Sequence, residues 1–156
     1  MMLVFLLASA GGWHFETLRD PLGQPVYVAS VAPDAARPFV HLKYSCGGIV
    51  GVELQFNLGE MQYAEPDFSR AAPAFENVRF AFPEGNYDTT AKRAPITDGI
   101  ATYEIKGSEA AFVASLLKDS DNVVVSRKNV SFSFPLSGAR FAIDEVLSAC
   151  PFKYRE

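Results

Sequence analysis

The chain of 156 residues has only two cysteines, Cys46 and Cys150, and only two histidines, His14 and His41. It has no Cys-x-x-Cys motif and no pair of histidines at ligand spacing, whereas a structural zinc site normally needs four such ligands close in space. No metal site is therefore expected. It also has no glycine-rich motif of the phosphate-binding kind, so no cofactor is expected.

Long apolar runs and clusters of basic residues are also missing from the sequence. A membrane-spanning helix needs about 20 consecutive apolar residues, and no segment reaches that length. Lysine and arginine are scattered, and the net charge is −4. This charge disfavours nucleic acid and anionic membrane surfaces as main partners.

The composition that remains is that of one folded domain, which we place at residues 11–156. Hydrophobic residues make up 49% of the chain and charged residues 21%, which excludes a disordered chain and a coiled coil. The length is sufficient to bury a hydrophobic core. No internal repeat or linker divides the chain.

The first ten residues, 1–10, are apolar and end in Ala8-Ser9-Ala10, the pattern of small residues at a secretory cleavage site. The segment lacks a positively charged start and is short, so we interpret it as a truncated signal peptide. The expected location is periplasmic or secreted. The alternative is that residues 3–10 form the first β-strand of the mature fold.

Export has a consequence for the two cysteines. Thiols in an oxidising compartment normally pair, so Cys46 and Cys150 are predicted to form a disulfide. The bond would join an early strand to a helix near the C-terminus. The alternative is a cytosolic protein with two free buried thiols.

Apolar residues alternate with polar ones along most of the chain, the period of strands with one buried face. Gly47-Gly48 and the segment 19–25 are rich in turn formers and predict hairpins. Polar or turn-rich loops are expected at 59–73 and 83–99. The predicted strands cover residues 13–18, 26–31, 40–46, 50–58, 77–82, 101–106, 123–126 and 130–136.

Two segments show helical spacing instead. Residues 109–118 follow Ser108, a predicted N-cap. The second helix has an apolar stripe from Ala139 to Cys150, with Ser137 as its predicted cap and Pro151 as its end. The expected fold is mainly β: an antiparallel sandwich or curled sheet of about seven to eight strands with two short helices, one of them C-terminal.

Several of these residues carry a family resemblance. They are Trp13, the turn Asp20-Pro21-Leu22-Gly23, the strand residues Leu42, Tyr44 and Cys46, and the segment from Phe132 to Ile143 that runs through a helix to Cys150-Pro151-Phe152. In this order they resemble the invasion-associated locus B group of exported bacterial proteins and the VasI-like accessory proteins of type VI secretion systems. The resemblance implies a β-rich periplasmic domain with no established enzymatic role.

The polar loop at 59–73 is the candidate binding segment, because long loops in compact domains are often functional. Its candidate residues are Glu60, Tyr63, Glu65, Asp67 and Phe68. The three carboxylates could also serve acid–base hydrolysis of a glycan. A catalytic role for either histidine is disfavoured because no Gly-x-Ser-x-Gly accompanies them, and both are expected to be exposed strand residues.

Three functions are compatible with these observations. The leading hypothesis is a non-catalytic exported protein that acts through protein–protein contacts, as an accessory of an envelope or secretion assembly. The alternative is a periplasmic inhibitor or small-ligand-binding module, similar to lysozyme inhibitors. The third is a hydrolase that depends on the loop carboxylates.

Overall fold

A computed structural model describes residues 12–49, 51–59, 75–94 and 100–150. The predicted leader, 1–10, and almost all of the predicted binding loop fall outside these residues. The strands are β1 (His14–Arg19), β2 (Pro25–Val31), β3 (His41–Gly47), β4 (Gly51–Asn57), β5 (Phe75–Phe82), β6 (Gly85–Arg93), β7 (Tyr103–Lys106), β8 (Asn122–Arg127) and β9 (Val130–Pro135). The helices are α1 (Gly107–Leu117) and α2 (Ala139–Ala149).

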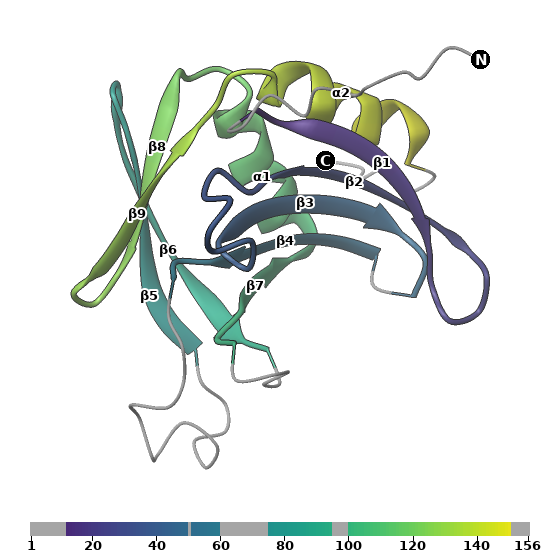
Figure 1. Cartoon of the computed structure of the whole chain (residues 1–156), viewed down its shortest axis with the longest axis horizontal. Helices are drawn as coiled ribbons and strands as arrows, with labels where there is room; N and C mark the ends of the chain where they lie inside the picture. The colour runs from purple at the N-terminus through teal and green to yellow at the C-terminus, as the bar shows by residue number, and fades with distance from the viewer. Residues whose placement is uncertain (1–11, 50, 60–74, 95–99, 151–156) are drawn as a thin grey trace.

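The nine strands form one antiparallel sheet in the order β1-β2-β3-β4-β7-β6-β5-β8-β9. The sheet is open, with β1 and β9 at its edges. It is strongly curved, so that β1–β4 form one half and β5, β6, β8 and β9 the other (Figure 1). Of the predicted alternatives, the structure is therefore a curled single sheet.

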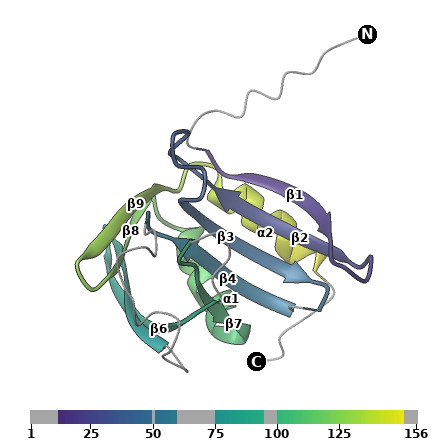
Figure 2. The ribbon, with the colours of Figure 1, turned by 60° about the horizontal axis from the view of Figure 1, so that its bottom comes forward.

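Both helices pack on the inner face of this curve (Figure 2). Helix α1 contacts β4 and β7, and α2 contacts β2, β1 and β3. The alternation predicted from the sequence directs Leu42, Tyr44, Leu54 and Phe56 inward, where they are almost completely buried. Aromatic rings join the two halves, since Phe56 lies edge-to-face with Phe80 at a centroid distance of 6.0 Å.

The prediction of seven to eight strands was too low because the segment 83–99 was expected to be a turn-rich loop. It contains β6, whose nine residues pair along their whole length with β5 or β7. Only Ala91 of this strand is fully buried. Its strand conformation depends on ladder hydrogen bonds to neighbours rather than on its own hydrophobicity.

Both helices begin differently from the prediction. Helix α1 starts at Gly107, so Ser108 lies within its first turn, and Lys106 occupies the N-cap position without a side-chain hydrogen bond. Helix α2 has Gly138 as its N-cap, with a φ of 80° that favours glycine. The carbonyl of Ser137 instead accepts a hydrogen bond from the backbone N–H of Trp13.

Cys46 in β3 and Cys150 at the end of α2 lie in position for the predicted disulfide. Their Cα atoms are 5.7 Å apart, within the usual range for disulfides, and both side chains are buried. The bond would hold the last helix against the inner face of the sheet. Neither α1 nor α2, each of 11 residues, is long enough to cross a membrane, and no other described helix is present.

Trp13 connects the two edges of the open sheet. Its indole Nε1–H donates to the carbonyl of Pro135 at 2.8 Å, and the residue is 8% exposed. We expect Trp13→Phe to lower the free energy of unfolding by about 1–2 kcal/mol, because the partly buried carbonyl loses its donor. Denaturant unfolding followed by circular dichroism measures this. The exposed Phe141→Ala on α2 is the control, and equal effects from both variants would contradict the assignment.

Candidate functional site

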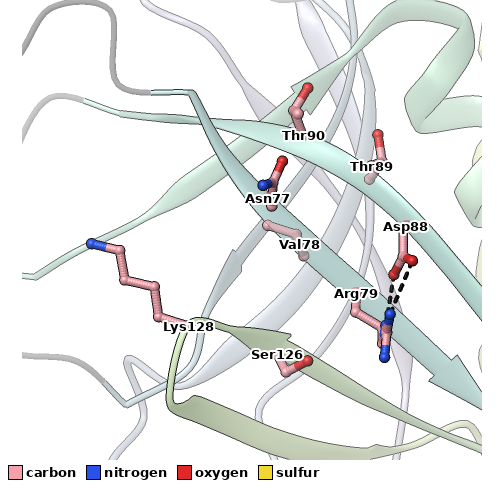
Figure 3. Close-up of a pocket in the computed structure, with 8 residues that line it drawn as sticks. All are labelled: Asn77, Val78, Arg79, Asp88, Thr89, Thr90, Ser126 and Lys128. Carbon is pink, nitrogen blue, oxygen red and sulfur yellow. Dashed lines mark hydrogen bonds and ion pairs between the residues drawn. The ribbon is translucent and has the colours of Figure 1, made fainter.

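A wide hollow lies on the outer face of β5, β6 and β8 (Figure 3). It has a volume of about 650 Å³. Strand alternation places short polar side chains and charges there. We call it the β5–β6–β8 hollow; it is lined by Asn77, Val78, Arg79, Asp88, Thr89, Thr90, Ser126 and Lys128.

Arg79 and Asp88 face each other across β5 and β6 and form a two-pronged ion pair. Arg79 Nε lies 2.7 Å from Asp88 Oδ1, and one terminal nitrogen lies 3.1 Å from Oδ2. The hydrogen bond from Arg79 lowers the pKa of Asp88, and the same bond raises the pKa of Arg79. Both groups therefore stay charged across the physiological range, which suits recognition of polar groups and not proton transfer.

A second hollow opens where β6 and β7 diverge. These strands pair only at Lys92↔Glu104 and Arg93↔Tyr103, and beyond these pairs a space of about 390 Å³ separates them. We call it the β6–β7 hollow; it is lined by Phe75, Thr89, Thr90, Lys92, Glu104, Ile105, Lys106 and Glu109. It shares Thr89 and Thr90 with the β5–β6–β8 hollow.

Helix α1 contributes Glu109 to this hollow. The carboxylate accepts hydrogen bonds from Tyr87 Oη at 2.9 Å and from Thr89 Oγ1. Glu109 lies in the first turn of the helix, where negative charge is favourable. Burial, together with the neighbouring Glu109, raises the pKa of Tyr87, so the phenol stays protonated and donates.

Glu53 lies on the outer face of β4, opposite Lys106 and beside Glu104. Only 6% of the residue is exposed. Burial is the main cause that raises its pKa, and Glu104 adds to the effect, while Lys106 and Lys43 oppose it. Such a carboxyl next to a hollow is a candidate for a functional group, although structural networks produce the same shift.

The raised pKa of Glu53 predicts a dependence of stability on pH. Its favourable contribution is present below the unfolded value, near 4.5, and is lost as the pH rises through the folded value. We therefore expect Glu53→Gln to raise the melting temperature by a few degrees at pH 7 and to have little effect at pH 4. Thermal unfolding at both pH values measures this, with the exposed Glu16→Gln as the control. An equal shift at both pH values would contradict the prediction.

The predicted site residues have different outcomes. Glu60, Tyr63, Glu65, Asp67 and Phe68 lie outside the described residues, so their role stays a prediction. His14 is exposed, as expected, and its Nε2 lies 3.4 Å from Ser30 Oγ. Among the residues that the structure describes, no carboxylate forms a hydrogen bond with the His14 ring in the way that orients a catalytic histidine.

His41 was expected to be exposed, and this was wrong. It is partly buried, with Nδ1 at 2.7 Å from the carbonyl of Phe39 and Nε2 at 3.2 Å from Gln55 Oε1. Burial lowers its pKa, so the ring is neutral at pH 7. Ser45 and Glu53, which face each other on the same outer face, are also buried.

Sequence reasoning missed the residues of both hollows. Asp88, Thr90 and Lys92 belong to β6, which was expected to be a loop. The alternation of Tyr87, Thr89 and Ala91 was the available signal. In the described part of the chain, no group of three or more metal-ligating side chains comes together.

Comparison with protein-family models, with curated proteins and with solved structures gave no match to this chain. The geometry of the two hollows and of the cysteine pair therefore carries the functional argument.

Proposed function

We propose that this is a non-catalytic exported protein that acts through contacts with a protein partner. Its place would be that of an accessory in an envelope or secretion assembly, as the resemblance to type VI secretion accessory proteins suggests. The observation that supports contact best is the β5–β6–β8 hollow. It is wide and open, and it presents hydroxyl, amide and already paired charged groups from three adjacent strands.

These groups suit a protein interface for a physical reason. Arg79 and Asp88 are held by each other, so their remaining donor and acceptor positions are pre-oriented at little entropic cost. Asn77, Thr90 and Ser126 offer adaptable hydrogen bonds around the pair. Lys128 at the rim is 62% exposed and can guide a partner of opposite charge.

Site-specific photo-crosslinking tests this proposal. A benzoylphenylalanine at Thr90, inside the hollow, should give a discrete adduct with a different protein in cells that express the chain. The same group at Glu16, on the outer face of β1, is the matched control. Absence of an adduct at Thr90, or equal adducts at both positions, would contradict the proposal.

The second candidate, a small-ligand-binding module, is supported by the β6–β7 hollow. Its volume of about 390 Å³ lies in the range of small-ligand pockets, and Phe75 adds an aromatic surface to its charged groups. A thermal-shift screen of small polar ligands tests this candidate. A ligand that binds in the hollow should raise the melting temperature of the unmodified protein but not that of Thr90→Trp, whose larger side chain should fill the space. The hydrolase hypothesis stays a prediction about Glu60, Glu65 and Asp67.

A further inference from the structure

The edge strand β9 exposes part of its backbone. Lys128 and Asn129 form a two-residue turn between β8 and β9, with Lys128 at a φ of 51°. In such a hairpin the closing pair, Arg127 and Val130, exchanges hydrogen bonds, and every second residue after it does the same. The N–H and C=O groups of Ser131 and Ser133 therefore point away from β8, toward the open edge.

Two observations at the end of β9 agree with this assignment. Pro135 has the same parity as Ser131 and Ser133, and proline fits an edge-facing position because it has no N–H to pair. Its carbonyl accepts the indole hydrogen of Trp13 at 2.8 Å, so that end of the edge is occupied. No backbone hydrogen bond from the described residues outside the sheet reaches Ser131 or Ser133, and both are exposed.

The sequence of this open segment carries none of three common protections against pairing. Natural edge strands carry charges, internal prolines or bulges. The guanidinium of Arg37 lies over the ring of Phe132 at 5.8 Å, so the charge nearest to the segment contacts a side chain and not the free backbone groups. Between Val130 and Phe134 there is no charged residue and no proline, and the register with β8 continues without a bulge. The other edge strand, β1, carries Glu16 and Arg19.

We propose that the β9 edge is a docking site for the β9 strand of a second copy of this chain. The open segment reads Val-Ser-Phe-Ser-Phe and is nearly symmetric about Phe132. In antiparallel self-pairing centred on Phe132, Ser131 of each copy lies opposite Ser133 of the other copy. Phe132 of one copy lies opposite Phe132 of the other. The two serine pairs then exchange four backbone hydrogen bonds, and the two-fold axis closes the assembly.

The sequence thus complements itself at every position of the pairing, and this favours a second copy over an unrelated peptide. Trp13 at Pro135 confines the pairing to the segment that is symmetric. Because one strand pair buries little surface, the dimer should be weak and concentration-dependent. Light scattering coupled to size-exclusion chromatography of the oxidised protein should show a mass that rises toward twice that of one chain across a concentration series.

Paired substitutions test both the edge and its register. Ser131→Lys combined with Ser133→Lys places like charges opposite each other and should give a monomer at every concentration. Ser131→Lys combined with Ser133→Glu places opposite charges in register and should restore a dimer that weakens with salt. Both serines are exposed, so thermal unfolding should stay close to that of the unmodified protein.

Thr17→Pro on β1 is the control for the other edge and should leave the dimer intact. Ser133→Pro removes an N–H group that faces the open edge and makes no hydrogen bond to β8. This variant should therefore abolish the dimer by a second route. A protein that is monomeric at all concentrations would overturn the proposal. A dimer that survives the double lysine variant, fails to return with the Lys–Glu variant, or is lost in Thr17→Pro would also overturn it.

Discussion

Replacing Cys46 and Cys150 with alanine should lower the free energy of unfolding by about 4–5 kcal/mol, the largest effect we expect from any pair of substitutions. The two residues are 104 positions apart, and a bond that closes so long a loop strongly restricts the unfolded chain. That amount approaches the whole stability of a modest domain. Urea unfolding of the oxidised protein and of the double variant measures the difference.

Reduction of the unmodified protein is the matched control, because it opens the bond without changing side-chain volume. The reduced protein and both single variants, Cys46→Ala and Cys150→Ala, should lose most of the same stability, since each lacks the bond. The variants that replace Cys46 should lose slightly more stability than the reduced protein, because this side chain is completely buried in the core. A reduced protein as stable as the oxidised one would show that the cross-link contributes nothing.

Glu76→Gln should lower the free energy of unfolding by about 3 kcal/mol, the second largest effect. The Glu76 side chain is 11% exposed and contacts Arg127, which is 2% exposed. Arg93 Nε and Lys128 Nζ lie 3.7 and 3.8 Å from the same carboxylate. Removing its charge leaves three cations, Arg93, Arg127 and Lys128, near one another.

The arrangement around Arg127 explains why the loss is large. Its guanidinium lies over the ring of Tyr103 at 4.8 Å, so it is held between an aromatic face and the carboxylate. Lys128→Gln is the matched control, because this lysine is 62% exposed and should contribute less than about 0.5 kcal/mol. If Glu76→Gln lowers the free energy of unfolding no more than the control does, Glu76 does not stabilise the three cations around it.

The sequence was sufficient to predict the elements whose burial pattern is regular. Leu42, Tyr44 and Cys46 alternate with polar residues, and they form β3 with the expected face inward. Strand β6 was missed because it begins with Gly85 and Asn86 and contains Asp88, residue types that are depleted in strands, and because its conformation depends on pairing with β5. The N-cap of α2 was predicted one residue too early, at Ser137. Gly138 is the N-cap because it adopts a left-handed conformation, which the sequence alone does not show.

The candidate site was harder to predict than the fold. The hollows bring together residues from β5, β6, β7 and β8. Which of these residues become neighbours is determined by the strand order, in which β7 lies between β4 and β6. No local motif carries that order. The burial of Arg127, which lies on the same inward face of β8 as Val123 and Val125, could not be predicted from the sequence either. Its stabilising partners come from β5 and β7.

Export, the anchoring of α2 and the proposed contact function are all linked to the bond between Cys46 and Cys150. Cells expressing the chain can be treated with acid and an alkylating reagent, and the protein digested without reduction and analysed by mass spectrometry. We predict one peptide pair that joins Cys46 to Cys150, and no alkylated cysteine. Two fully alkylated thiols would contradict the account.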